Sequence, residues 1–281
     1  MLEGGGMRGL FTAGILDFFL DNGIQFKSCM GVSAGAAHAS SYVCGQSGRA
    51  RDVSVDYLDD KNYCGLYSLL TTGNFFNTKM VYRTIPQKYY PLNQVHFDNS
   101  LTAFYGVVTN CDTGEPEYLR IADVNAQMDV IRASASLPLL SHMVEIGGKR
   151  YLDGGMADSI PLEKSIAMGN AKNVVVLTQA LGYQKKPDKL FPIMKVKYRK
   201  YPELLAAMQA RPETYNRSLE KVAELEKKGE VFVLRPKAPL AVGRLEKDRG
   251  KLLGIYELGY QQAEQQGESL LNFLSDSQSG R

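Results

Sequence analysis

The stretch CMGVSAGAA, from Cys29 to Ala37, decides the fold of this chain. An apolar run comes before it and predicts a strand, and the small helix-forming residues within and after it predict a helix. The pattern Gly31-x-Ser33-x-Gly35 therefore falls on a sharp turn from strand to helix. Such a turn, the nucleophile elbow, exposes a serine hydroxyl, and its glycines let the helix cross the strand closely. We predict that Ser33 is a nucleophile.

Length and composition predict a folded protein of ordinary make-up. The chain has 281 residues, 44% of them apolar and 22% charged, and its net charge of +3 is too small to indicate nucleic-acid binding. Its four cysteines show neither a C-x-x-C pair nor zinc-site spacing, which predicts free thiols in a reducing compartment. No apolar run reaches the roughly 18 residues that span a bilayer, and no signal-peptide pattern begins the chain. We expect a cytoplasmic protein.

A second glycine-rich stretch, GGGMRG, occupies residues 4–9. It also spells the dinucleotide pattern G-x-G-x-x-G, but that site needs an acidic residue at the end of the next strand, and this strand ends in Gly-Val-Ser. No Lys-Ser or Lys-Thr follows to make a Walker loop. Consecutive glycines can instead turn several N–H groups toward one point. We predict that Gly4, Gly5 and Gly6 form an oxyanion hole, supported by Arg8; a plain tight turn remains the alternative.

Later strands place a carboxylate at a strand end. Residues 101–109 and 115–121 have the β-branched and aromatic character of paired strands, and residues 144–152 predict a hairpin. This hairpin delivers Asp153 directly after a strand, where α/β proteins build their sites. Residues 172–179 contain the run VVVL, which is typical of a parallel strand buried on both faces.

A serine hydroxyl needs a base to remove its proton. In α/β-hydrolases the order along the chain is Ser, acid, His, yet all three histidines here, His38, His96 and His142, precede Asp153. His38 lies more than a helical turn beyond Ser33 and points away from it. We therefore predict that Asp153 activates Ser33 directly. His142 stays open as an alternative base, and an Asp-Gly pair is by itself also a turn former.

A basic segment over residues 185–200 carries seven cationic residues against one acidic residue, with apolar residues between them. One interpretation is a solvated helical face; the other is docking on an anionic membrane surface. The lysines that would make this contact are Lys185, Lys186, Lys195, Lys197 and Lys200.

Three blocks together resemble the patatin-like phospholipase family: residues 4–9, residues 31–35 and residues 153–155, in the family's order and spacing. The sequence ASASLP at residues 133–138 resembles a flanking segment of the family as well. The resemblance covers about residues 1–180, and the rest is similar to the extension of bacterial members. Only three residues precede the glycines, where the family has a full strand.

The resemblance implies an α/β fold, a three-layer α/β/α sandwich with a mainly parallel central sheet over residues 1–180, and a mainly helical extension over residues 181–281. It implies a dyad of Ser33 as nucleophile and Asp153 as base, with no metal and no cofactor. The implied activity is hydrolysis of carboxylic esters of phospholipids or other acyl esters, as in phospholipase A or lysophospholipase. An acyltransferase with the same dyad, or a non-catalytic lipid- or membrane-binding protein, remains an alternative.

Overall fold

The centre of the sheet is a parallel pair of buried strands, β1 (Ser28–Val32) and β2 (Ala103–Asn110). A third strand, β3 (Pro116–Ile121), runs antiparallel along one edge of β2. The hairpin of β4 (Val144–Ile146) and β5 (Lys149–Asp153) pairs with the end of β2. The computed structural model describes residues 1–275.

Leu2 connects these strands to a second parallel pair, β6 (Asn173–Val176) and β7 (Val231–Leu234). It makes parallel bridges to β1 on one side and to β6 on the other, and its N–H donates to the Met30 carbonyl oxygen at 2.9 Å. The Glu3 N–H donates to the Val176 carbonyl oxygen at 3.0 Å, so the residues before the glycines lie between β1 and β6 as a strand does. The sheet is mixed, because the pairs on the β1, β6 and β7 side are parallel and those of β3, β4 and β5 are antiparallel.

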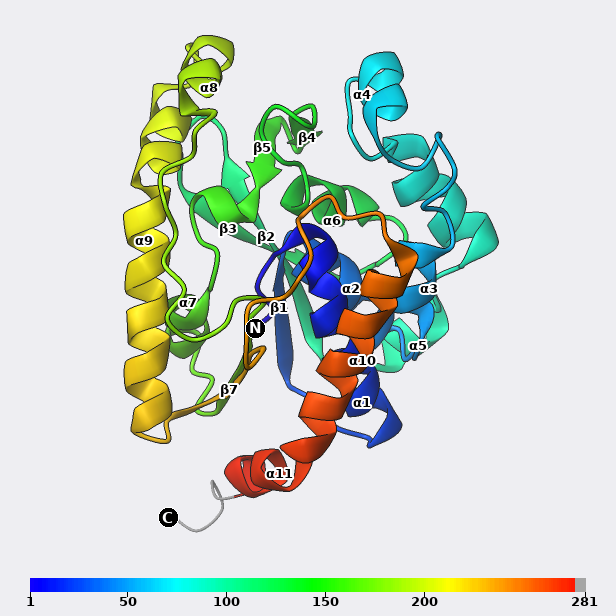
Figure 1. Cartoon of the computed structure of the whole chain (residues 1–281), viewed down its shortest axis with the longest axis vertical. Helices are drawn as coiled ribbons and strands as arrows, with labels where there is room; N and C mark the ends of the chain where they lie inside the picture. The colour runs from blue at the N-terminus through cyan, green and yellow to red at the C-terminus, as the bar shows by residue number, and fades with distance from the viewer. Residues whose placement is uncertain (276–281) are drawn as a thin grey trace.

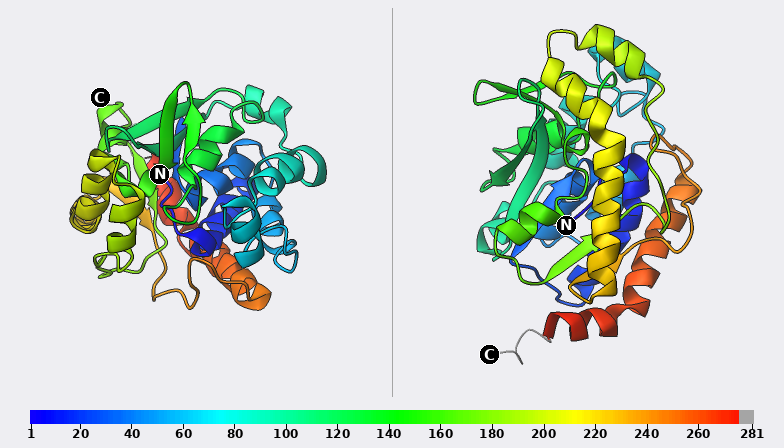
Figure 2. Two further views of the ribbon diagram at one scale, coloured as in Figure 1. Left: turned by 90° about the horizontal axis from the view of Figure 1, so that it is seen from above. Right: turned by 90° about the vertical axis from the view of Figure 1, so that its left-hand side faces the viewer.

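Helices cover both faces of the sheet, which confirms the α/β/α sandwich (Figures 1 and 2). Val174 and Val176 of β6 pack into the cluster beneath the first helical layer, whereas Val175 packs against the second. This division explains the continuous apolar run in β6, because both faces of the strand are buried. The first layer contains α1 (Leu10–Asp21), α2 (Ala34–Val43), α6 (Met128–Ser134), α10 (Arg249–Gln265) and α11 (Gly267–Ser275). The second contains α7 (Leu162–Ala167), α8 (Phe191–Lys197) and α9 (Pro202–Lys227).

Shorter elements complete the chain. Single 3₁₀ turns, η1 (Gly6–Gly9) and η3 (Gly154–Met156), follow the first glycines and β5. The segment between α2 and β2 holds α3 (Arg49–Val55), α4 (Leu66–Thr72), the π-type helix η2 (Met80–Tyr89) and α5 (Gln94–Asn99). No helix within residues 1–275 combines the length and the apolar character that crossing a bilayer requires.

The C-terminal part of the chain contributes to the same sheet and core. β7 extends the sheet beside β6, and α10 packs along α1 (Figure 1). The segment 235–248, which we call the strap, runs from β7 across the first 3₁₀ turn to α10. The predicted division near residue 180 falls in the loop between β6 and α8, and it stays a prediction.

Candidate active site

The pairing of β2 brings the ends of β1 and β5 together. Phe104 pairs with β1 and β3, and Val108 pairs with β5 and β3, so β1 and β5 occupy the same edge of β2 in succession. β1 ends opposite Val107 and β5 ends opposite Val108. Because β1 is parallel and β5 antiparallel to β2, their carboxyl ends meet. Ser33 follows the first strand and Asp153 closes the second, so main-chain pairing alone places them side by side.

Ser33 has the backbone of a nucleophile elbow. Its φ of 57° is a conformation that non-glycine residues rarely adopt, and its carbonyl oxygen accepts the first hydrogen bonds of α2, from Ala36 and Ala37. A Cβ at Gly31 would lie 2.4 Å from Ala36 Cα, and one at Gly35 would lie 2.5 Å from the Leu2 carbonyl oxygen. Both glycines are therefore required by the close crossing of strand and helix.

Asp153 is buried, with 1% of its surface exposed. Its Oδ1 accepts a hydrogen bond from the Gly155 N–H at 2.8 Å, and its Oδ2 has no partner. Burial raises the pKa of this carboxyl, while the Ser33 hydroxyl and the charges of Arg211 and Arg244 oppose the shift. Although no hydrogen bond of ordinary geometry joins Ser33 to Oδ2, such bonds are often long before substrate is bound.

The segment 133–138 holds both residues of the pair. Ser134, fully buried on α6, accepts a hydrogen bond from the Ser33 N–H at 2.9 Å. The carbonyl oxygen of Ser136 accepts one from the Asp153 N–H, also at 2.9 Å. The sequence ASASLP identified this segment as part of the family resemblance, but it did not predict these two hydrogen bonds.

The glycine loop lies against Ser33. A Cβ at Gly4 would be 2.6 Å from Ser33 Cβ, so only glycine fits there. Gly6 has a φ of 58°, and the Met7 N–H donates to the carbonyl oxygen of Arg244 in the strap at 3.0 Å. Within the described chain, the N–H groups of Gly4 and Gly5 make no hydrogen bond, which leaves them free for an anion.

One small cavity of about 30 Å³ unites the predicted groups: Ser33, Asp153, Gly4, Gly5, Gly6 and Arg8 all line it. The histidines lie elsewhere. His38 packs against Gly9, and burial lowers its pKa to about 4. His96 lies against Gly45 and His142 against Gly73. The cavity with Ser33 therefore contains no histidine that could serve as its base.

Three cationic residues that sequence reasoning did not assign to the site also line this cavity. They are Lys185 from the loop after β6, Arg211 from α9 and Arg244 from the strap. The placement of Lys185 in the surface lysine set is thus wrong, because this residue is half-buried beside Ser33. No motif connects these three residues, which are far from Ser33 in the sequence.

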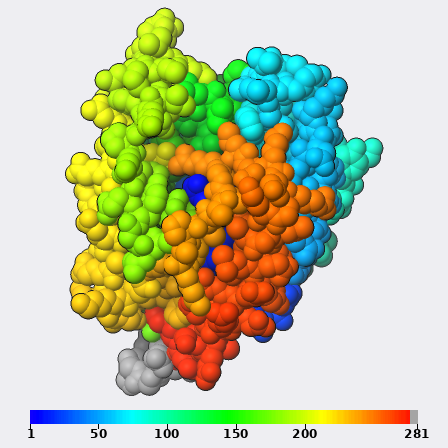
Figure 3. Space-filling view, viewed as in Figure 1, coloured from blue at the N-terminus to red at the C-terminus, as the bar shows by residue number. Residues whose placement is uncertain are grey.

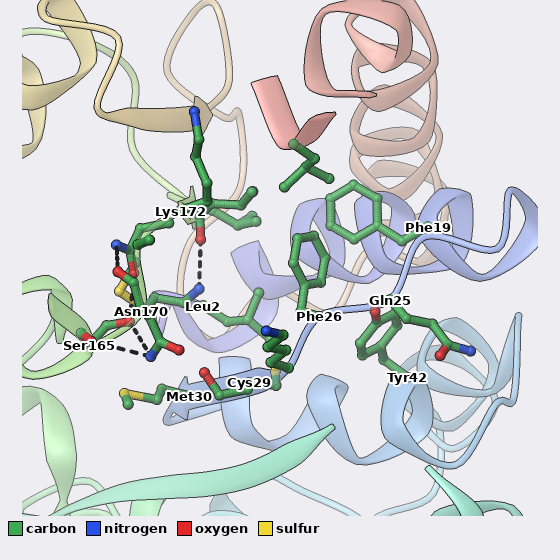
Figure 4. A pocket seen from close by; sticks show the side chains of 18 of the residues that line it. Leu2, Phe19, Gln25, Phe26, Cys29, Met30, Tyr42, Ser165, Asn170 and Lys172 are labelled. Carbon is green, nitrogen blue, oxygen red and sulfur yellow. Dashed lines mark hydrogen bonds between the residues drawn. The ribbon is translucent and has the colours of Figure 1, made fainter. Parts of the chain in front are cut away.

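A larger cavity of about 410 Å³ lies at the other, amino-terminal end of β1 (Figure 4). Phe19, Phe26 and Tyr42 line one side, and Ser165 and Asn170 lie across from them. Burial raises the pKa of Cys29 in its wall to about 11, so this thiol stays protonated at neutral pH. Cys29 is therefore not an activated nucleophile. No three His, Cys, Asp or Glu side chains gather as a metal site anywhere in residues 1–275.

Residues 1–166 match the family model described as Patatin-like phospholipase, and the chain belongs to this family. Residues 201–275 match a domain of unknown function, DUF6363.

Two similar proteins are relevant. The uncharacterized protein YjjU of Escherichia coli strain K12 is 35% identical over 181 residues, which cover 62% of this chain and 50% of that protein. The chain thus spans about half the length of this relative. The crystal structure of VipD from Legionella pneumophila superposes with a TM-score of 0.51 at 14% identity, covering 95% of this chain and 66% of that one. This likeness supports the fold.

Proposed function

We propose that this protein is a serine acyl hydrolase that cleaves carboxylic ester bonds of lipids, as a phospholipase A or lysophospholipase does. The observation that carries the proposal is the meeting of a strained serine with a buried, unpartnered carboxylate oxygen beside a glycine loop. Membership of the patatin-like phospholipase family supports the choice of lipid esters.

In the proposed mechanism, Ser33 Oγ attacks the ester carbonyl carbon while Asp153 Oδ2 takes the hydroxyl proton. The free N–H groups of the glycine loop stabilise the negative charge on the carbonyl oxygen. Collapse of the intermediate expels the alcohol, which receives the proton from Asp153, and leaves an acyl ester on Ser33. Water then gives a proton to the same carboxylate and attacks the acyl ester, and Ser33 Oγ takes that proton as it leaves and the fatty acid is released.

The raised pKa of Asp153 suits this task. A carboxylate with an ordinary pKa near 3.9 is a weak base, and burial makes Asp153 a stronger one. The unpartnered Oδ2 is the atom available for the proton. An acyltransferase would share every step up to the acyl-enzyme and differ only in the acceptor. A non-catalytic lipid-binding protein would have no need of the strained elbow.

A fluorophosphonate probe, which reacts with activated serines, tests the proposal. We expect labelling of the wild type and of Ser47→Ala, an exposed serine outside the cavity, and none of Ser33→Ala. Asp153→Asn should slow labelling and ester hydrolysis by roughly 100-fold or more, because the base is lost. Labelling of Ser33→Ala to the same extent as the wild type would contradict the proposal. Adding an alcohol acceptor and measuring how the acyl group partitions between it and water separates the hydrolase from the acyltransferase.

Peripheral contact with an anionic membrane is the second part of this proposal. Lys186, Lys195, Lys197 and Lys200 are exposed, and α8 also exposes Ile193 and Val196. Exposed apolar side chains among lysines are the composition of a surface that docks on anionic lipid.

A further inference from the structure

Four cationic side chains converge on the cavity of Ser33 without a counter-ion. Arg8, Lys185, Arg211 and Arg244 all line it, yet in the part of the chain that the structure describes none of them forms an ion pair or a side-chain hydrogen bond. The Nε atoms of Arg8 and Arg211 are buried and have no partner at all. Buried donors of this kind are rare in folded proteins, so each one needs an explanation.

The carboxylates of the cavity do not neutralise these charges. Glu3 Oε2 accepts hydrogen bonds from the Thr178 N–H at 2.7 Å and its hydroxyl at 3.2 Å, and Glu3 Oε1 accepts one from the Tyr215 hydroxyl at 2.6 Å. Asp153 accepts one from the Gly155 N–H. These four cationic side chains therefore face two carboxylates whose hydrogen bonds all go to uncharged groups.

The arrangement is unfavourable in the empty protein. Burial, together with the charges of Arg211, Arg244 and Arg8, lowers the pKa of Lys185 to about 7, and the charge of Glu3 opposes this shift. Its ammonium lies 4.2 Å from the centre of the Tyr215 ring. Burial also lowers the pKa of Arg211. Clustered like charges that destabilise the free protein are typical of a site that binds the opposite charge.

The surroundings add an apolar component. A second cavity of about 100 Å³ shares Lys185, Arg211 and Arg244 with the first. Its other walls include Met156, Phe191 and Met208, and the exposed Asp188, whose charge acts on Arg211, also lines it. Figure 3 shows N-terminal atoms at the bottom of a hollow bordered by the strap, in orange, and by the loop after β6, in green. An anion in this hollow would lie beside both Ser33 and an apolar wall.

We propose that Arg8, Lys185, Arg211 and Arg244 form a phosphate-binding subsite beside Ser33, so that the substrate is an acyl ester with an anionic phosphate a short linkage from its scissile carbonyl. The glycerol linkage of a glycerophospholipid separates its ester from its phosphate by only a few bonds. Guanidinium groups suit phosphate because their donors match its oxygens in pairs. The assignment of the substrate rests on the proposed hydrolase function, whereas the assignment of the phosphate-binding site does not. The phosphate could belong to a lipid headgroup or be free.

The choice of donors gives the C-terminal part of the chain a role. Arg211 and Arg244 both lie within residues 201–275, the region that matches a domain of unknown function. They come from α9 and from the strap, and the strap also holds the glycine loop through the Arg244 carbonyl oxygen. We infer that this region completes the substrate site of the patatin-like core.

Binding is tested without turnover, in the Ser33→Ala protein, with dihexanoyl phosphatidylglycerol and inorganic phosphate as probes in calorimetry. Further replacement by Arg211→Gln or Arg244→Gln should weaken lipid binding by about tenfold to 100-fold, the loss of a charge-assisted hydrogen bond. Arg217→Gln on α9, which removes an exposed arginine, should leave affinity unchanged. Equal affinity in all variants overturns the subsite. Inorganic phosphate that binds as tightly as the lipid keeps the subsite but overturns the lipid substrate.

The assignment of the substrate is tested by measuring turnover in proteins that retain Ser33. The quantity to compare is kcat/KM for dihexanoyl phosphatidylglycerol divided by kcat/KM for dihexanoylglycerol, measured at a pH high enough that Asp153 is ionised. We expect this ratio to fall by about tenfold or more in Arg211→Gln and in Arg244→Gln. An unchanged ratio overturns the substrate assignment. If the wild type hydrolyses neither lipid but binds the anionic one through these arginines, the proposed hydrolase function fails and the subsite stands.

Discussion

At the scale of the residue, Ser33 and Asp153 are both held away from their preferred states. The serine has a positive φ, and the aspartate has a buried oxygen without a hydrogen bond. Neither feature stabilises the fold, so the surrounding structure must supply the free energy that maintains them. The bonds from Ser134 and Ser136 show how this is done, because each ties the main chain of one residue to the same short segment.

Hydrolysis should depend on pH through Asp153. The base must be ionised, so kcat/KM for a neutral ester should rise with pH through the raised pKa of Asp153 and then level off. The charge of Arg211 opposes this rise in the pKa, and Arg211→Gln should therefore move the midpoint to higher pH. A pH–rate profile of p-nitrophenyl butyrate hydrolysis measures both. A midpoint below 3.9, the ordinary pKa of aspartate, would contradict the assignment.

The same shift has a consequence for stability, with the opposite sign. Because the folded-state pKa of Asp153 is raised, the folded protein holds this proton more tightly than the unfolded chain does. The contribution of Asp153 to the free energy of unfolding is therefore greatest below the unfolded pKa and is lost as pH rises through the folded one. Activity thus requires the less stable protonation state.

At the scale of the element, the contact of α1 with α10 is decided by two glycines. A Cβ at Gly14 on α1 would lie 2.1 Å from the Tyr256 carbonyl oxygen, and one at Gly259 on α10 would lie 2.0 Å from that of Phe11. The two helix backbones therefore touch, and neither position has space for a methyl group. Since α10 begins where the strap ends, this contact also anchors the segment that carries Arg244.

Replacing glycine by alanine at two positions of α10 should have opposite effects. Gly259→Ala must push the helices apart and should destabilise the fold by about 1–3 kcal/mol or more. Gly254→Ala lies on the same helix with nothing within 4 Å of the new methyl group and should stabilise it by roughly 0.5–1 kcal/mol. Urea unfolding of the two variants and the wild type gives the comparison. Equal stabilities would show that the backbones do not pack as closely as described.

At the scale of the whole molecule, two helices with exposed apolar side chains lie at the same end. Figure 1 shows α4 and α8 on either side of the upper end of the molecule. Leu66 and Leu70 of α4 are 72% and 83% exposed, and Ile193 and Val196 of α8 are 56% and 68% exposed. A lipid surface against this end would contact both helices.

Charge reversal on α8 and just after it tests the contact. Changing Lys195, Lys197 and Lys200 together to Glu should release the protein from anionic vesicles, since each lysine near such a surface contributes about 1 kcal/mol. Co-sedimentation with phosphatidylglycerol vesicles, in parallel with neutral ones, measures the effect. The matched control reverses Lys221, Lys227 and Lys228 near the end of α9, away from α8 (Figure 1). Unchanged sedimentation of the first variant would return these lysines to an ordinary solvated face.

The local parts of the candidate site could be predicted from sequence patterns alone. G-x-S-x-G specifies a strand, a strained turn and a helix within a few residues, a run of glycines specifies exposed N–H groups, and a hairpin puts Asp153 at a strand end. Those patterns are local because their hydrogen bonds and steric limits lie between near neighbours in the chain.

Which of these parts meet, and which other residues join them, depends on tertiary packing. Ser33 and Asp153 are neighbours because β1 and β5 share one edge of β2. The sequence pattern groups Lys185 with the surface lysines, yet this residue lines the cavity with Arg211 and Arg244. Such contacts depend on which segments pack together although they are far apart in the sequence. Hydrophobic periodicity and motif spacing are local patterns and do not predict that packing.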